Sequence, residues 1–308
     1  MRVCAVDIGT NSVRSVVADV TPPSIVAVVH YSGRITRLGE GFGSSRTLQA
    51  EAIERTVRTA AEFVEHGKQL GASALRLVAT SAARDAHNAH ELVQALRDAT
   101  GIEPEIASGE REAALVLAGV RASGLLGPGP SLVVDVGGGS TELITVMPGQ
   151  PPRLLSIDVG AVRLTERFIK TNPPGLDEIA SASAHAEAEL AGIDITHGAL
   201  DLVGLGGTIT TIAAMLLALT VYDAAKVHRY TVTLDDVERL IRRMAGLSTD
   251  QRRELPGLEP GREDIIVAGC LIVRAVMRAA CSTRMRVSTA GILYGIALDA
   301  AGLVPASG

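Results

Sequence analysis

Residues 3–12 read VCAVDIGTNS, and residues 132–141 read LVVDVGGGST. Each segment is an apolar, β-branched run that ends in Asp, turns through glycine and is followed by a second apolar run. Two such β-hairpins in one chain predict a duplicated architecture. Glycine at a turn allows positive φ and lets backbone N–H groups approach a ligand closely, so each turn can cradle phosphate. We therefore expect two phosphate-binding turns, one from each half, that face a shared cleft.

The length of 308 residues exceeds the usual single core and favours two domains of roughly 150 residues. The best linker is GLLGPGP at residues 124–130, directly before the second hairpin. We expect a first domain over residues 1–124 and a second over 125–290, with a C-terminal helix at about 291–308 that packs back on the first. Alternating strands and helices predict an α/β fold with a mainly parallel sheet beyond each hairpin.

Composition and charge exclude several classes of protein. A net charge of −5 argues against a nucleic-acid binder, because such binding needs clustered Lys and Arg. Asp7 interrupts the first apolar run, which argues against a signal peptide. The uncharged stretch 202–222 is interrupted by glycines and threonines and is too short for a membrane span. The three cysteines lack metal-ligand spacing, and we expect buried thiols in a cytoplasmic protein.

Two carboxylates compete for a catalytic role. Glu110 and Glu112 follow a Ser-Gly turn at the predicted start of a helix, where a carboxylate can orient or deprotonate water. The helix dipole alone would also favour an acidic residue at this position. The residue pattern therefore leaves Glu110 and Glu112 equal.

Asp135 and Glu142 lie on either side of the second glycine turn. If the hairpin closes between residues 137 and 140, the two carboxylates face one another and can share Mg²⁺, with Mn²⁺ as the alternative. We expect Asp7 to support the same ion. A turn-capping Asp and an exposed strand Glu are the alternative interpretation.

Phosphate oxygens need several hydrogen-bond donors, and the expected donors lie in both hairpins and at two helix starts. Backbone N–H groups, short hydroxyls, an amide and a guanidinium supply them. They are Gly9, Asn11, Ser12, Ser81, Arg84, Gly137, Gly138, Gly139, Ser140, Gly207 and Thr208.

Five ordered motifs resemble those of the exopolyphosphatase and guanosine pentaphosphate phosphohydrolase (Ppx/GppA) family. They are DIGTNSVR at 7–14, ATSAARDA at 79–86, SGEREA at 108–113, DVGGGSTEL at 135–143 and GLGGT at 204–208. GAVRLTERF at 160–168 and YDAAKVH at 222–228 are similar to its short actinobacterial members. The resemblance implies a duplicated actin-like (ribonuclease H-like) two-domain fold, shared with sugar kinases and heat-shock ATPases, with the active site in the interdomain cleft.

The resemblance also implies a function. The expected enzyme is an exopolyphosphatase that uses Mg²⁺ to hydrolyse the terminal phosphate of inorganic polyphosphate, with Glu112 rather than Glu110 as the water-activating base. The resemblance also supports the assignment of Arg84 as a phosphate ligand and of Asp135 and Glu142 as metal ligands. The alternative substrate is guanosine pentaphosphate, the substrate that links the family to the stringent response. Alternatives of another class are an actin-fold small-molecule kinase and a non-catalytic guanosine tetraphosphate sensor.

Two departures from the family pattern add expectations. Longer members append a helical C-terminal region that extends a basic channel, whereas this sequence ends at Gly308, so we expect a preference for short polyphosphate. The family usually carries a charged pair before its last glycine, but residues 288–295 read STAGILYG here.

We expect a homodimer with no nucleic-acid or membrane partner.

Overall fold

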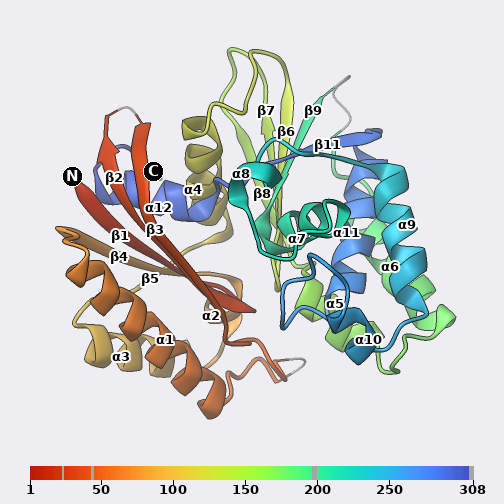
Figure 1. The fold of residues 1–308 in the computed structure, drawn as a ribbon, viewed down its shortest axis with the longest axis horizontal. Coiled ribbons are helices and arrows are strands. Elements are labelled where there is room, and N and C mark those ends of the chain that lie inside the picture. Colours follow the sequence, from red (N-terminus) through yellow and green to blue (C-terminus); the bar gives the residue numbers. More distant parts are fainter. Residues whose placement is uncertain (23, 43–44, 196–199, 305–308) are drawn as a thin grey trace. The chain divides into compact units, whose positions relative to one another are not determined.

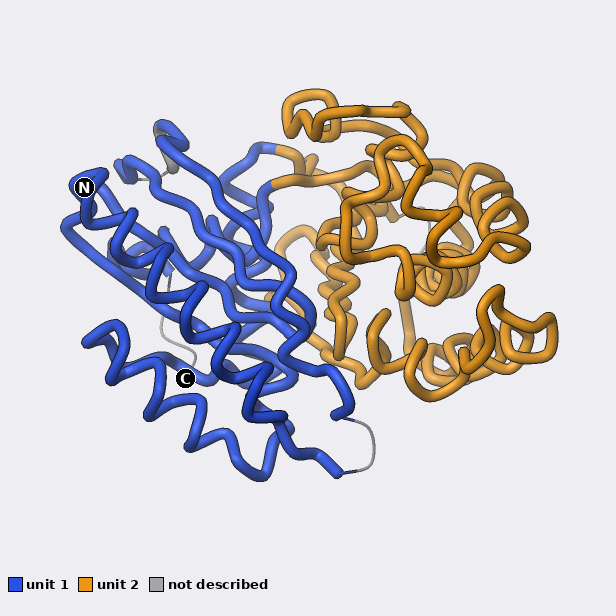
Figure 2. Tube along the Cα trace, turned by 60° about the horizontal axis from the view of Figure 1, so that its bottom comes forward, with its two compact units in different colours: residues 1–124, 290–308 blue, residues 125–289 orange. Residues whose placement is uncertain are grey.

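The computed structural model describes residues 1–22, 24–42, 45–195 and 200–304. The chain divides into two compact units: residues 1–124 with 290–308 form unit 1, and residues 125–289 form unit 2 (Figure 2). Residues 305–308, at the end of the expected C-terminal helix, lie outside the described residues. No helix in the described part of the chain is long and apolar enough to cross a membrane.

Unit 1 is a five-stranded sheet between two helical layers (Figure 1). The strand order is β3-β2-β1-β4-β5, antiparallel from β3 to β1 and parallel from β1 to β5. The strands are β1 (Arg2–Ile8), β2 (Ser12–Thr21), β3 (Ser24–Ile35), β4 (Ala74–Ala79) and β5 (Glu105–Ile106). The helices are α1 (Ala50–Gln69), α2 (Ser81–Asp85), α3 (Ala89–Thr100), α4 (Gly109–Ala122) and α12 (Ile292–Ala300).

Strand β1 is apolar on both faces because a helical layer covers each face. Cys4 and Val6 pack in the core that α1 and α3 cover. Val3 and Ala5 pack in the core that α4 and α12 cover. Side chains of a strand alternate between its two faces, so a continuous apolar run is the expected pattern for a central strand with both faces buried.

Helices α4 and α12 touch through their backbones. A Cβ atom added at Gly295 would lie 1.9 Å from the carbonyl oxygen of Leu115, and one at Gly119 would lie 2.0 Å from that of Gly291. Only glycine fits at such distances. The C-terminal helix α12 is thereby joined to unit 1, although residues 125–289 separate it in sequence.

Unit 2 repeats the same plan with six strands in the order β10-β11-β9-β6-β7-β8. Strands β6, β9 and β11 are parallel, while β7, β8 and β10 run antiparallel to their neighbours. The strands are β6 (Ser131–Val136), β7 (Thr141–Val146), β8 (Arg153–Ile157), β9 (Asp201–Leu205), β10 (Thr231–Thr233) and β11 (Arg284–Val287). The helices are α5 (Ala161–Phe168), α6 (Leu176–Leu190), α7 (Gly206–Leu216), α8 (Ala224–Val227), α9 (Leu234–Ala245), α10 (Thr249–Arg253) and α11 (Ile266–Ala279).

The apolar helix α11 is the centre of the unit 2 core. Its buried residues pack with the inward side chains of β6 and with α6, α7 and α9. Strands β3, β8 and β10 are antiparallel to their neighbours, so the sheets are parallel beyond the hairpins only at β4, β5, β9 and β11.

One expectation about the cysteines is wrong. Cys4 and Cys270 are buried free thiols, but Cys281 is exposed. It follows the C-cap of α11 with φ at 49°, and its N–H donates to the carbonyl of Arg278 at 2.9 Å. A residue in this left-handed position ends the helix, so its side chain leaves the apolar face.

Replacing Gly295 with Ala tests the contact between α4 and α12. The added methyl group would overlap the Leu115 carbonyl, so we expect Gly295→Ala to lower the free energy of unfolding by about 2 kcal/mol. Urea denaturation followed by circular dichroism measures this loss. Gly127→Ala is the control, since a Cβ there would meet no atom within 4 Å. Equal stability of the two variants would contradict the close contact.

Candidate active site

Unit 1 gathers its predicted site residues at the carboxyl ends of three neighbouring parallel strands. The chain leaves β1, β4 and β5 at the same edge of the sheet, where ligands of α/β proteins commonly bind. Main-chain hydrogen bonds join these exits: Thr80 N donates to Ile8 O at 3.1 Å, and Ala107 N donates to Ala79 O at 2.9 Å. The first glycine turn and the starts of α2 and α4 therefore come together.

The first glycine turn is held from behind by residues 36–39. Thr36 N and Arg37 N donate to the Asn11 carbonyl at 3.0 and 2.9 Å, and Gly39 N donates to the Thr10 carbonyl at 2.8 Å. In a trans peptide the N–H points away from the carbonyl of the same peptide group. The N–H of Asn11 therefore points away from the supporting segment.

Two predicted phosphate ligands carry buried polar atoms that bond to no described residue. They are Asn11 Nδ2 and Ser81 Oγ, in residues that are 6% and 2% exposed. A buried polar atom without a partner costs about 1–3 kcal/mol. A polar ligand at the edge of the sheet would remove this cost. Asp7 and Ser12 are also buried, at the end of β1 and the start of β2.

The structure pairs Glu112 with Arg84. Glu112 lies in the first turn of α4, which Ser108 caps by accepting a hydrogen bond from Arg111 N at 3.1 Å. Arg84 Nη1 donates to Glu112 Oε2 at 2.9 Å and to the Ala107 carbonyl at 3.1 Å. Arg84 was predicted as a phosphate ligand, and this contact with the candidate base was not predicted.

Glu110 has a different environment. It is exposed, and hydrogen bonds from its own backbone N–H and from the Ser108 hydroxyl lower the pKa of its carboxyl group. These contacts are typical of an acidic residue that stabilises a helix start. The structure therefore separates two carboxylates that the residue pattern left equal.

The second glycine turn is also held from behind, here by the start of α5. Ala161 N donates to the Gly137 carbonyl at 2.9 Å, and Val162 N donates to that of Gly138 at 2.8 Å. Arg163 Nε donates to the Gly139 carbonyl at 2.9 Å. The N–H groups of Gly138, Gly139 and Ser140 therefore point away from α5. Three successive N–H groups on one side of a turn form an anion-binding concavity.

Asp135 and Glu142 are direct partners in the antiparallel ladder of β6 and β7, so their side chains emerge on the same face. Glu142 is 1% exposed, and its Oε1 accepts hydrogen bonds from Ser140 Oγ at 2.8 Å and Ser156 Oγ at 2.9 Å. The Ser140 hydroxyl, predicted to bind phosphate, thus donates to a carboxylate. The contact of Ser156 with Glu142 was not predicted. It arises because the two residues are partners in the ladder of β7 and β8.

Gly206 makes room for the Asp135 carboxylate. It has φ at 88°, and a Cβ at this position would lie 2.2 Å from Asp135 Oδ1. Any other side chain would be strained here and would displace the carboxylate.

The donor set fits magnesium. Two carboxylates on one face supply the hard oxygen ligands that Mg²⁺ prefers, and Mg²⁺ usually completes its shell with water and substrate phosphates. No cluster of three or more His, Cys, Asp or Glu that could hold a metal occurs among the described residues.

Helix α7 begins with two further predicted phosphate ligands. Gly207 and Thr208 lie in its first turn, where backbone N–H groups have no partner within the helix. Thr208 is 2% exposed, and its side chain lies against Gly269 of α11. The hydroxyl therefore packs in the core, and the candidate donors here are main-chain N–H groups.

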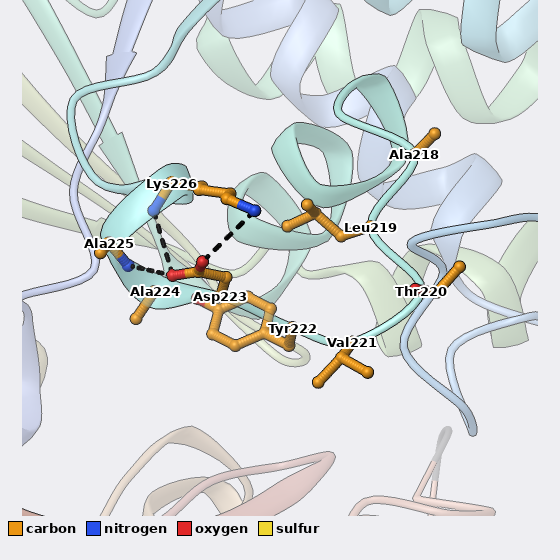
Figure 3. A pocket seen from close by; sticks show the side chains of 9 residues that line it. All are labelled: Ala218, Leu219, Thr220, Val221, Tyr222, Asp223, Ala224, Ala225 and Lys226. Atoms are coloured by element: carbon orange, nitrogen blue, oxygen red, sulfur yellow. Dashed lines mark hydrogen bonds and ion pairs between the residues drawn. The ribbon is translucent and has the colours of Figure 1, made fainter.

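A hollow in unit 2 is lined by residues 218–226 and contains none of the predicted ligands (Figure 3). Asp223 caps the short helix α8 by accepting from Ala225 N at 3.0 Å, and Lys226 Nζ lies 3.7 Å from its carboxylate. The exposed side chains of Val221 and Tyr222 form the outer part of the lining. The charged groups of the hollow thus stabilise a helix start.

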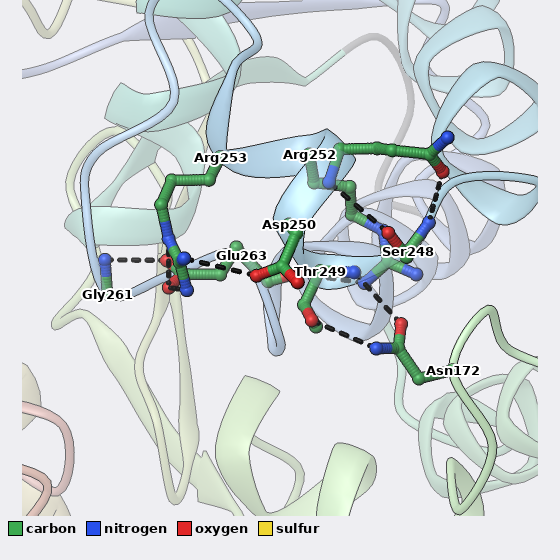
Figure 4. Close-up of polar contacts among 9 residues, drawn as sticks. Asn172, Ser248, Thr249, Asp250, Arg252, Arg253, Gly261 and Glu263 are labelled. Atoms are coloured by element: carbon green, nitrogen blue, oxygen red, sulfur yellow. Dashed lines mark hydrogen bonds and ion pairs between the residues drawn. The ribbon is translucent and has the colours of Figure 1, made fainter.

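A second polar cluster surrounds α10 (Figure 4). Arg252 is 2% exposed and donates to the carbonyls of Met244 and Glu263 at 3.1 and 2.8 Å, and burial lowers the pKa of its guanidinium. Arg253 donates to the Glu263 carboxylate at 2.8 Å. These two arginines join α9, α10 and the start of α11, which is a structural role.

The segment that departs from the family pattern, residues 288–295, begins in unit 2 with Ser288 and Thr289 and continues in unit 1 from Ala290. Ser288 N donates to the Gly204 carbonyl at 2.8 Å, and Thr289 N donates to His228 Nδ1 at 3.3 Å. Burial, and to a lesser extent Arg229, lowers the pKa of His228, which favours the neutral ring that can accept this bond. His228 of the YDAAKVH motif therefore helps to hold the end of β11.

The fold and the two turns define a duplicated α/β protein with a glycine turn after the central strand of each unit and a carboxylate at the end of that strand. The model of the Ppx/GppA phosphatase family matches residues 16–303, and the chain belongs to this family. The resemblance stated from the motifs is confirmed.

Relatives and solved structures agree with this assignment. Exopolyphosphatase 2 of Mycobacterium tuberculosis is 36% identical over 98% of this chain and 99% of its own length. Exopolyphosphatase 1 of Mycobacterium bovis is 31% identical over 91% of this chain and 82% of its own length. The crystal structure of the Aquifex aeolicus Ppx/GppA family member superposes with a TM-score of 0.82, at 30% identity, and covers 100% of this chain and 99% of its own. The predicted duplicated α/β fold class is thereby confirmed.

Removing the Ser156 hydroxyl tests the orientation of Glu142. Ser156→Ala deletes a described hydrogen bond to Glu142 Oε1, so we expect about a 10-fold weaker affinity for the metal, as is usual when a partner of a ligand is lost. Titration of the protein with Mn²⁺, followed by electron paramagnetic resonance, measures this without turnover. Ser183→Ala, on α6, is the control. Equal Mn²⁺ affinity of both variants would contradict the role of Ser156.

Proposed function

We propose that this protein is an exopolyphosphatase that hydrolyses the terminal phosphoanhydride bond of inorganic polyphosphate. The observation that supports it most is the buried Glu112 carboxylate, fixed by Arg84 at the strand edge that also carries the first glycine turn. The names of the mycobacterial relatives support the substrate class.

In the proposed reaction unit 1 offers phosphate oxygens the main-chain N–H of Asn11 and the side chains of Asn11 and Ser81. Unit 2 offers the main-chain N–H groups of its glycine turn and of the start of α7. Glu112 orients a water molecule in line with the terminal phosphate and accepts one of its protons as the water oxygen forms a bond to phosphorus. The bond to the bridging oxygen breaks, and the shortened chain leaves as a phosphate. Positioning and charge stabilisation account for most catalysis in phosphoryl transfer, so preformed N–H donors suit this chemistry.

Asp135 and Glu142 of unit 2 would hold Mg²⁺, with Mn²⁺ as the alternative ion, and Asp7 of unit 1 stays a predicted supporting carboxylate. When bound, the ion would neutralise charge on the phosphate oxygens. The two serine hydroxyls on Glu142 keep the carboxylate in one orientation, which a site with few protein ligands requires.

Guanosine pentaphosphate is the second candidate substrate, because its terminal 5′ phosphate presents the same phosphoanhydride chemistry. Phosphate release from polyphosphate, from guanosine pentaphosphate and from ATP with an acceptor panel tests the proposal. Release from polyphosphate supports an exopolyphosphatase. Transfer from ATP would indicate a kinase, and binding of guanosine tetraphosphate without turnover of any substrate would indicate a sensor.

We further propose a cytoplasmic homodimer. Two buried free thiols suit a reducing compartment. Light scattering of the purified protein tests the dimer.

Glu112→Gln tests the candidate base. The amide keeps the size of the side chain but cannot accept a proton, so we expect kcat on polyphosphate to fall roughly 10²-fold or more, with near-normal binding. Glu110→Gln is the matched control two residues away and should change kcat little, because Glu110 is exposed. An equal loss in both variants would reject the assignment of Glu112.

The digestion pattern of long polyphosphate tests how the polymer is held. A net charge of −5 gives little general attraction for a polyanion, so we expect short chains to be preferred and products to be released after each cleavage. On a gel the whole population should shift gradually to shorter lengths. Full-length chains beside free phosphate, with no intermediates, would show processive action and contradict this expectation.

A further inference from the structure

Arg84 makes the most specific unpredicted contact of the candidate site. Its Nη1 atom donates both to Glu112 Oε2 at 2.9 Å and to the Ala107 carbonyl at 3.1 Å. Ala107 directly follows β5, so the guanidinium connects the strand edge to the candidate base. Both side chains are largely buried, with 21% of Arg84 and 11% of Glu112 exposed.

The second hydrogen bond makes this contact more than an ion pair. A lone ion pair between flexible side chains leaves the carboxylate free to rotate, but the Ala107 carbonyl fixes the guanidinium to the main chain. A carboxylate with little access to water also needs a positive partner to remain ionised. The contact with Arg84 thus orients the Glu112 carboxylate and places a positive charge beside it.

We propose that Arg84 is a positioning residue that holds the Glu112 carboxylate ionised and aimed at the attacking water. This inference rests on the proposed function and deepens it, because it gives Arg84 a role that acts through the base rather than on phosphate alone.

The other charged groups near this pair do not provide the same contact. Asp85 Oδ1 lies 3.9 Å from Arg84 Nε. Glu110 is exposed, and the charge of Arg84 is the smallest of the causes that lower the pKa of its carboxyl group. Arg111, beside Glu112 in sequence, is paired with Glu105 at 2.9 Å and Asp299 at 2.7 Å. Arg84 thus contacts Glu112 directly, at 2.9 Å, while Arg111 is paired with other carboxylates.

The experiment measures kcat and KM for short polyphosphate between pH 5 and 9 for the wild type, Arg84→Gln and Arg84→Lys. In Arg84→Gln the low-pH side of the profile of kcat against pH, its acid limb, should move to higher pH by roughly one unit. Without the positive charge the Glu112 carboxylate protonates more easily as pH falls. Arg84→Gln should also lose about 10²-fold in kcat, since a misplaced base costs that much. Arg84→Lys should restore the acid limb but not the full kcat, because it keeps the charge without the planar fork.

A double-mutant cycle separates positioning from phosphate binding. If Arg84 acts through Glu112, Arg84→Gln should change kcat less than 3-fold when Glu112 is already Gln. Arg97→Gln is the matched control, because Arg97 forms a comparable pair with Glu103 at 2.7 Å on the surface. It should leave kcat and the pH profile unchanged. Thermal unfolding of each variant shows whether the fold is intact.

The outcomes also separate this inference from the proposed function. A wild-type enzyme that does not cleave any phosphoanhydride would overturn the proposed function. An active wild type whose Arg84 variants raise only KM, with an unmoved acid limb and additive losses in the cycle, would overturn the positioning role. In that case Arg84 would be a phosphate ligand alone.

Discussion

The candidate site depends on the direction of a few peptide groups. In each unit a glycine turn follows the central strand, and a segment behind it donates hydrogen bonds to the turn's carbonyl oxygens. Residues 36–39 do this in unit 1, and the start of α5 does it in unit 2. Since a trans peptide presents its N–H opposite its carbonyl, each contact behind the turn aims a donor forward. The N–H donors of each turn are thus preformed. Preformed donors need little reorganisation when charge develops on a group that they contact.

The preformed turns also require that neighbouring segments pack very close to them. Gly160, before α5, would place a Cβ 2.3 Å from the Gly138 carbonyl oxygen, so only glycine allows the helix to reach the turn. Gly206 does the same for the Asp135 carboxylate. Several glycines of this chain are therefore needed for packing around the site rather than for its flexibility.

The carboxylates are each held by a partner from another element. Arg84 of α2 holds Glu112 of α4, and Ser156 of β8 holds Glu142 of β7. Oriented carboxylates lose less freedom when they bind a metal or a water molecule, and preorganisation of this kind is a general source of catalytic efficiency. The same principle explains why Glu110 is a poor candidate, because its contacts are those of a helix start.

The sequence alone determined the duplicated hairpins, the α/β class, the family and the identity of most candidate ligands. These features are local: a β-branched run ending in Asp and Gly specifies a strand and a turn through the residues themselves. Closure of the second hairpin between residues 137 and 140 also predicted that Asp135 faces Glu142, and the ladder of β6 and β7 confirms it.

Only the tertiary structure decided how these ligands are supported. Ser156 lies 14 residues from Glu142, and Arg84 lies 28 residues from Glu112, so no local pattern links either pair. The exposure of Cys281 likewise followed from its left-handed position after α11 rather than from its residue type. Strand order and helix packing bring such residues together, and those depend on the burial of apolar surface over the whole unit.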